Sequence, residues 1–129
     1  MRNFKQSILV LCLLVSVILS EAKHVHIRND IGENIDLMVH CKSKNDDLGD
    51  HLLHPQETYE FAFTPNIFGT TLFFCGFTWA GQPKFFNIYD DRAHSSSCGD
   101  CYWAVHVDGP CLLKNDFGEI DTCYKWNSP

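Results

Sequence analysis

The feature that most constrains the fold is the two-residue period of apolar side chains along much of the chain. Polar and apolar residues alternate over His24–Arg28, Ile35–Cys41 and Tyr59–Phe63. Because successive side chains of a strand point to opposite faces, this spacing predicts strands with one buried face. Thr70–Phe77 is instead a nearly continuous apolar run, which predicts a strand buried on both faces.

Further short strands and frequent turn signals complete this pattern. The other segments expected to form strands are residues 84–89, 102–107, 111–113 and 119–124. Clusters of Asn, Asp, Gly and Pro separate the expected strands, and these are the usual turn residues. No window carries the 3.6-residue apolar stripe of a long helix. The chain is therefore predicted to be all-β, an antiparallel β-sandwich of seven to eight short strands.

Residues 1–22 have the layout of a secretory signal peptide. Arg2 and Lys5 precede an almost entirely apolar run over Ile8–Leu19, and small residues follow at the positions that a signal peptidase reads. The run is shorter than the about 20 residues that span a bilayer. We therefore expect cleavage after Ala22, no membrane insertion, and a single secreted, extracellular domain over residues 23–129.

Six of the seven cysteines remain after the signal peptide is removed. An even number in a small secreted chain predicts a disulfide-stapled fold, but the sequence alone does not choose the pairing. The cysteines expected to be bonded are Cys41, Cys75, Cys98, Cys101, Cys111 and Cys123. Cys98 and Cys101 have the spacing of a redox pair. That chemistry requires the pair at the start of a helix, whereas here it precedes a strand, so we expect both to bond to other cysteines.

The charge balance narrows the classes of partner. The formal net charge is −6 at pH 7, and removal of the signal peptide brings it to about −7. An acidic chain argues against nucleic-acid binding and against attachment to anionic lipid through bulk charge. The length fits one domain, and we expect a monomer.

Most aromatic residues on the expected strands are predicted to build the core, because aromatic residues are enriched in strands. The alternative is a carbohydrate-stacking or ligand-binding face. The residues concerned are Phe61, Phe63, Phe73, Phe77, Trp79, Phe85, Tyr89 and Trp103. Trp126 lies close to Cys123, where a disulfide would staple the C-terminal tail to the sandwich.

The sequence contains two kinds of candidate metal site. His24 with His26, and His51 with His54, are spaced so that each pair could grip a metal, but such pairs arise easily among seven histidines. The acidic segment 45–50 lacks the ligand and glycine positions of a calcium-binding loop. We expect no metal and no cofactor.

Five motifs follow one another along the chain after the N-terminal segment. They are VHCKSKNDDLG (39–49), NIFGTTLFFCGF (66–77), PKFFNIYDD (83–91), CYWAVHVDGPC (101–111) and DTCYKWN (121–127). In this order they resemble the plant self-incompatibility protein family, the S-protein homologues. The resemblance implies a small secreted plant protein with a β-sandwich domain, which acts as a signalling ligand for a cell-surface receptor. In the best-understood members, this signal leads to the rejection of self pollen.

Two other classes of function remain open. One is a secreted defence or developmental protein that binds a microbial or cell-wall target, and the other is a hydrolase. A hydrolase has little support, because no nucleophile-elbow sequence occurs and Asp90 and Asp91 would point to opposite faces of a strand end. We therefore expect a binding protein without catalytic residues.

Recognition is expected on two polar loops, residues 42–50 and 90–100. Both are rich in charge and poor in apolar residues, and loops on a rigid scaffold commonly carry recognition. The candidate residues are Lys42, Lys44, Asp46, Asp47, Asp50, Asp91, Arg92 and His94. For the first loop an alternative stays open, in which Asp46 or Asp47 bonds backbone groups in a turn and serves folding.

Overall fold

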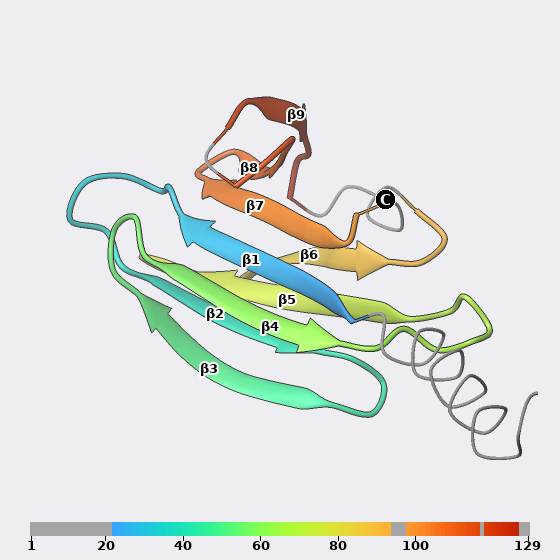
Figure 1. The fold of residues 1–129 in the computed structure, drawn as a ribbon. Coiled ribbons are helices and arrows are strands. Elements are labelled where there is room, and N and C mark those ends of the chain that lie inside the picture. The colour runs from blue at the N-terminus through green and yellow to red at the C-terminus, as the bar shows by residue number, and fades with distance from the viewer. Residues whose placement is uncertain (1–21, 94–97, 117, 127–129) are drawn as a thin grey trace, which may run out of the picture.

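The computed structural model describes residues 22–93, 98–116 and 118–126, and these residues form nine strands in two sheets (Figure 1). The strands are β1 (Lys23–Asn29), β2 (Leu37–Lys42), β3 (Asp47–Leu53), β4 (Thr58–Phe63), β5 (Leu72–Thr78), β6 (Lys84–Asp90), β7 (Asp100–His106), β8 (Gly109–Leu113) and β9 (Ile120–Cys123). Apart from Ala22, the predicted signal peptide lies outside the described residues.

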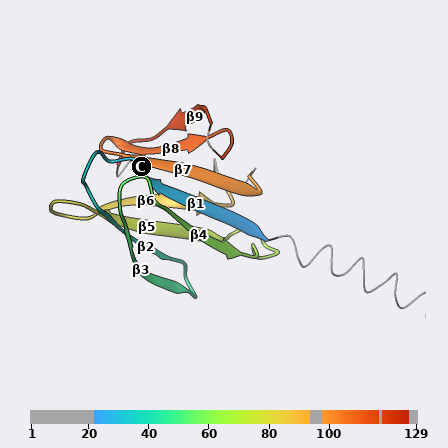
Figure 2. The same ribbon diagram turned by 60° about the vertical axis from the view of Figure 1, so that its left-hand side comes forward.

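The two sheets lie face to face, as the turned view in Figure 2 also shows. One sheet has the order β4-β1-β7-β8-β9 and the other the order β3-β2-β5-β6. All neighbouring strands are antiparallel except β1 and β7, which run parallel. The long chain between β1 and β7 supplies the crossover that parallel neighbours require. The predicted β-sandwich is confirmed, with one parallel pair inside it.

The alternation of side chains fills the space between the sheets. The fully buried residues of β1 and β2 include Val25, Ile27, Leu37, Val39 and Cys41. On β5, Phe73, Cys75 and Phe77 are buried, whereas Phe74 is 39% exposed. The prediction that this strand is buried on both faces is therefore wrong, since among the described residues nothing forms a third layer outside the four-stranded sheet.

β3 is a strand where the sequence pattern predicts a loop. Only residues 43–46 make the turn, in which Ser43 N–H donates to the Asp46 carbonyl oxygen at 2.8 Å. β3 pairs with β2 and forms an edge of its sheet, with a register shift opposite Cys41. Gly49 has a φ of 77° at this irregularity. Charged residues and bulges are common on edge strands, so such a strand lacks the regular apolar alternation that identifies inner strands.

Most of the aromatic residues assigned to the core lie in it, as predicted. Phe61, Phe73, Phe77, Tyr89 and Trp103 are buried, and Phe63 and Trp79 pack against the core. Phe85 is an exception, because it is 51% exposed. β6 is an edge strand on which Phe86 packs against Trp103, with ring centroids 5.3 Å apart, while Phe85 lies on the opposite, outer face. The assignment of Phe85 to the core is therefore wrong.

Three disulfides join the six cysteines. The pairs are Cys41–Cys75, Cys98–Cys101 and Cys111–Cys123. Two of these join residues that lie directly opposite each other in register, with Cα atoms 4.0 Å apart. The expectation that Cys98 and Cys101 bond to other cysteines is wrong, because the strand register already pairs the other four.

The C-terminal tail is stapled to the sandwich. Cys123 bonds to Cys111, and Trp126 packs on Phe77 and Trp79 with ring centroids 5.3 and 5.8 Å away. The indole N–H of Trp126 donates to the carbonyl oxygen of Val107 at 2.8 Å. The tail therefore closes the same end of the core as the β7–β8 turn.

Asn29 is a fully buried polar residue at the end of β1. Its side-chain amide donates to the carbonyl oxygens of Ile35 (2.8 Å) and Leu53 (3.0 Å), and its oxygen accepts from Ile31 N–H (3.1 Å). Its backbone N–H donates to the Glu57 carbonyl oxygen at 3.0 Å. One side chain therefore ties the β1–β2 connection to the end of β3.

We expect Asn29→Ala to lower the free energy of unfolding by about 3 kcal/mol, because it leaves buried backbone groups without partners. Guanidinium unfolding followed by tryptophan fluorescence measures this loss. Asn45→Ala, in the exposed β2–β3 turn, is the control and should change stability by less than about 0.5 kcal/mol. A loss for Asn29→Ala as small as that of the control would contradict the assignment.

Removing the disulfides singly is expected to destabilise the protein in the order of the loops that they close. The sequence separations are 34 for Cys41–Cys75, 12 for Cys111–Cys123 and 3 for Cys98–Cys101. On the chain-entropy scale the expected losses for paired Cys→Ala variants are about 4, 3 and 1.5 kcal/mol. Denaturant unfolding of the three variants tests the order, which fails if loss of Cys98–Cys101 costs most.

Candidate functional site

Three connecting segments meet at one end of the sandwich. They are the β2–β3 turn, the β4–β5 loop and the chain that follows β6, all on the right in Figure 1. Together they line a cleft of about 720 Å³. Residues Ser43 to Asp46 of the first predicted recognition loop and Arg92 of the second both contribute to it. We call this region the loop end.

The structure divides the candidate recognition residues among strands and connections. Lys42 ends β2, Asp47 and Asp50 belong to β3, Lys44 and Asp46 lie in the turn, and Asp91 and Arg92 follow β6. His94 and the serines after it lie outside the described residues. The prediction that residues 42–50 form one loop is therefore wrong, because Lys42 belongs to β2 and Asp47 and Asp50 belong to β3.

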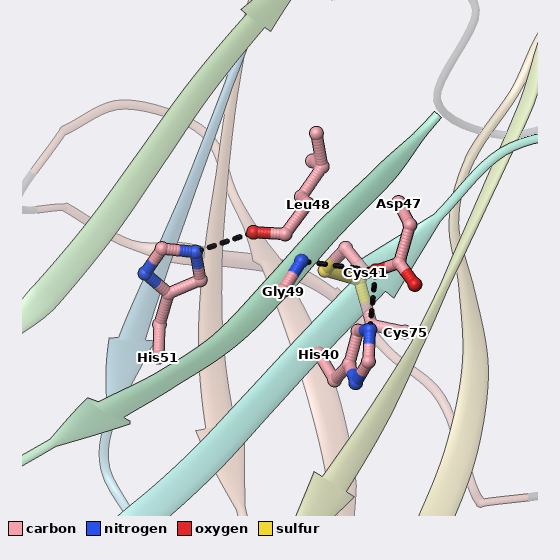
Figure 3. Close-up of a disulfide and its surroundings, with 7 residues drawn as sticks. All are labelled: His40, Cys41, Asp47, Leu48, Gly49, His51 and Cys75. Atoms are coloured by element: carbon pink, nitrogen blue, oxygen red, sulfur yellow. Dashed lines mark hydrogen bonds and ion pairs between the residues drawn. A yellow bond between two sulfur atoms is a disulfide. The ribbon is translucent and has the colours of Figure 1, made fainter. Parts of the chain in front are cut away.

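The carboxylates of β3 hold the edge strand to β2 (Figure 3). Asp47 accepts from Gly49 N–H at 3.0 Å and bonds to the ring of His40, whose other nitrogen lies 2.8 Å from Asp50. The Gly49 N–H first, and then His40, hold the pKa of the Asp47 carboxyl below its ordinary value. This geometry favours the structural alternative for Asp47, which is occupied in fixing its own strand.

Asp91 joins the chain after β6 to the β4–β5 loop. It accepts from the Tyr89 hydroxyl at 2.6 Å and from Thr71 N–H at 3.0 Å, and its own N–H donates to the Thr71 carbonyl oxygen at 3.0 Å. Burial, followed by the bond to Asp91, raises the pKa of the Tyr89 hydroxyl. Asp91 therefore orders the loop end from within instead of offering a free charge.

Asn66 gives the β4–β5 loop its shape. Its side-chain oxygen accepts from the N–H groups of Phe68 (3.0 Å) and Thr70 (3.1 Å), and its backbone N–H donates to the Thr71 hydroxyl at 2.8 Å. Gly69 has a φ of 68°, which glycine adopts without strain. An asparagine that bonds the backbone ahead of it in this way stabilises a turn.

This loop presents Ile67 and Phe68 to solvent. They are 85% and 80% exposed, the largest fractions among the large apolar residues that the structure describes. The charge-based selection of loops missed them. The sequence does carry a signal for them, because turn residues enclose the apolar pair, with Pro65 and Asn66 before it and Gly69 after it. An apolar pair within a turn lies outside the strands, so it does not contribute to a buried strand face.

The cleft combines an apolar floor with a polar rim. Phe63, Phe73 and Phe74 contribute rings to its lining, and Lys44 and Arg92 approach it from different segments. Within the described parts of the chain, neither cation lies within 4.0 Å of a carboxylate oxygen. Asp46 also lines the cleft, so its lining carries two cations and one carboxylate. The arrangement can therefore bury an apolar side chain of a partner beside a rim of net positive charge.

Each histidine considered as a metal ligand has a carboxylate or carbonyl partner, and His24 and His26 both contact Glu60, at 3.1 and 3.7 Å. The partners are Glu60 for His24, Asp100 for His26, the Leu48 carbonyl oxygen for His51 and Asp36 for His54. The hydrogen bond to Asp36 raises the pKa of His54. Over residues 22–93, 98–116 and 118–126, no three His, Cys, Asp or Glu side chains are grouped so that they could hold a metal ion. The same residues contain no helix of the length and apolarity needed to cross a membrane.

Comparison with known proteins gives consistent matches over most of the chain. A family model described as plant self-incompatibility protein S1 matches residues 24–126. S-protein homolog 3 of Arabidopsis thaliana is 44% identical over 113 residues, which cover 84% of this chain and 75% of that protein. S-protein homolog 2 of the same plant is 40% identical over 119 residues, covering 87% and 73%.

A solved structure shares the fold. It is described as a self-incompatibility protein homologue, from a widespread family of small, highly stable, secreted proteins of plants. It superimposes with a TM-score of 0.60 at 22% sequence identity, covering 83% of this chain and 96% of the other. This likeness supports the sandwich architecture.

We expect Asn66→Ala to loosen the β4–β5 loop while leaving the sandwich intact, because it removes the acceptor of two loop N–H groups. Amide hydrogen exchange at Phe68 and Thr70 should accelerate about tenfold, at a global cost below about 1 kcal/mol. Asn45→Ala, in the neighbouring turn, serves as the control and should leave both rates unchanged. Unaltered exchange in the Asn66 variant would show that the loop is held by other contacts.

Proposed function

The chain belongs to the plant self-incompatibility protein S1 family, and from this membership we propose that it is a secreted ligand of a cell-surface receptor. The signal-like segment at residues 1–22 supports export, with a mature chain that starts at Lys23. The solved relative, described as secreted, supports the same location. We propose a binding protein and not an enzyme, in line with the absence of an assembled catalytic motif from the sequence.

The observation that carries the proposal is the exposure of Ile67 and Phe68 on a loop that side-chain hydrogen bonds stabilise. Exposed apolar side chains that bind into a partner's pocket commonly dominate the binding energy of an interface. Because Asn66 and Asp91 already hold the loop, binding costs little further ordering. The loop end therefore combines exposed apolar side chains that a partner can bury with a loop that hydrogen bonds already hold in place.

The cations of the loop end suit an acidic partner surface. Lys44 and Arg92 lie on the rim of the cleft, in a chain whose formal net charge is −6. Local charges at an interface mainly set the orientation and the rate of association. We propose that these two residues orient the receptor, while Ile67 and Phe68 supply most of the affinity.

Rejection of self pollen is the narrower form of this proposal, since that process gives the family its name. A role in defence or development is its alternative. An expression profile separates them, because restriction to floral tissue supports reproductive signalling and expression throughout the plant supports the alternative.

The receptor proposal is tested with labelled mature protein and plant plasma membranes. We expect saturable binding, and we expect a variant with Ile67→Ser and Phe68→Ser to bind about 30-fold or more weakly, as loss of a hot spot worth about 2 kcal/mol implies. The variant should fold normally, because both side chains are exposed. Thermal unfolding and circular dichroism check this.

Ile120→Ser is the matched control, since Ile120 is 53% exposed on β9 at the edge of the other sheet. It should bind like the unaltered protein. Lys44→Glu combined with Arg92→Glu should mainly slow association. Equal binding by the Ile67/Phe68 variant and the unaltered protein would place recognition elsewhere, and a lack of saturable binding to any membrane would refute the receptor role.

A further inference from the structure

A second surface lies on the outer face of the four-stranded sheet. It is a shallow depression of about 270 Å³ that crosses β2, β5 and β6. Phe74 lines both this depression and the cleft of the loop end, so the two adjoin. Ile67, Phe68 and Arg92 do not line the depression. We call it the outer-face depression.

Two partly exposed rings border the outer-face depression. Phe74 on β5 is 39% exposed and Phe85 on β6 is 51% exposed. Gly76 pairs directly with Phe85, which places Phe74 and Phe85 diagonally across neighbouring strands. Such diagonal positions are about 7–8 Å apart, so the two rings can contact successive parts of one extended ligand.

The absence of a side chain at Gly76 lets the ring of Phe85 lie over the backbone of β5. A β-carbon at this position would lie 3.2 Å from Cε1 of Phe85, closer than an ordinary contact. The ring of Phe85 therefore occupies the space over the glycine backbone, and a larger residue would displace it. An apolar, partly solvated ring is thus held in place on the sheet instead of lying free at its edge.

Polar groups stand beside the rings on the same face. His40 pairs with Gly76 in register. Its ring bonds to Asp47, as Figure 3 shows, and its other nitrogen lies 2.8 Å from Asp50. Asp50 is on β3, next to β2, and lines the depression. A carboxylate has about four acceptor positions, so Asp50 can still accept hydrogen bonds from a ligand while it bonds to His40.

This chemistry selects a class of ligand. Exposed rings pack against apolar C–H surfaces, and carboxylate acceptors require hydroxyl or N–H donors. Asp50 and the negative net charge disfavour anionic ligands such as acidic peptides, nucleic acids or acidic polysaccharides. Lys42 also lines the depression, but its ammonium group lies 3.8 Å from the Asp47 carboxylate, which offsets its charge. A sugar ring, which has an apolar C–H face and hydroxyl donors at its rim, meets each condition.

We propose that the outer-face depression binds a neutral polysaccharide, with Phe74 and Phe85 packing against sugar rings and Asp50 accepting from their hydroxyl groups. This site is separate from the residues assigned to the receptor. The protein then carries two functions on adjoining surfaces, one that retains it on a neutral glycan and one that is recognised by a receptor.

The test is electrophoresis of the mature protein in native gels that contain xyloglucan, glucomannan or mixed-linkage β-glucan, with polygalacturonate as the anionic comparison. We expect at least one neutral polysaccharide to retard the protein and polygalacturonate to have no effect. Phe85→Ala and Phe74→Ala should each weaken the apparent affinity about tenfold. Phe74→Ala leaves the ring over Gly76 in place, so it provides the measurement if Phe85→Ala folds poorly.

Leu52→Ala is the matched control, because Leu52 is 51% exposed on β3 of the same sheet but does not line the depression. It should change the affinity less than about twofold. The Ile67/Phe68 variant should bind the polysaccharide normally, which separates this site from the receptor proposal. The inference is overturned by a lack of retardation in all three neutral gels, by retardation with polygalacturonate alone, or by equal losses in Leu52→Ala and Phe85→Ala.

Discussion

The hydrogen bonds of the buried Asn29 amide fix one end of the sandwich, and the rest of the architecture depends on them. They join the end of β1, in one sheet, to the backbone beside β2 and β3, in the other. Because a buried amide is costly without partners, the connections around it have one favourable arrangement. The two sheets are thereby held in a single relative position at this end, and Trp126 packs over the core from the C-terminal tail.

Closure of one end leaves the opposite end free to carry irregular backbone. There the β4–β5 loop is ordered by side-chain bonds from Asn66 and Asp91, and not by burial of its own apolar residues. This explains how Ile67 and Phe68 stay in solvent without collapsing onto the core. The two faces of the four-stranded sheet differ in a similar way. Its inner face is packed against the other sheet, while Phe74 and Phe85 on its outer face stay partly exposed.

The sequence predicted the inner strands, which have a clear two-residue apolar period. It did not predict features that depend on the position of a strand in its sheet. Inner strands such as β1 and β2 alternate clearly because one face of each is buried. β3 was missed because an edge strand with Asp47, Gly49 and Asp50 resembles a loop. Phe85 was misplaced because an aromatic residue looks the same on either face of a strand, and only the register shows that it lies over Gly76. The Cys98–Cys101 bond was rejected although the spacing suggests such a pair, because the strand register that pairs the other four cysteines cannot be read from the sequence.

The parallel pairing of β1 with β7 determines when the chain can finish folding. β1 lies between β4 and β7, and its register with β7 runs from His24 opposite Asp100 to Asn29 opposite Val105. The first strand therefore gains its second neighbour only when most of the chain is available, and such distant contacts make folding slow. The five-stranded sheet therefore cannot be completed before β7 is available, and until then β1 can pair only with β4.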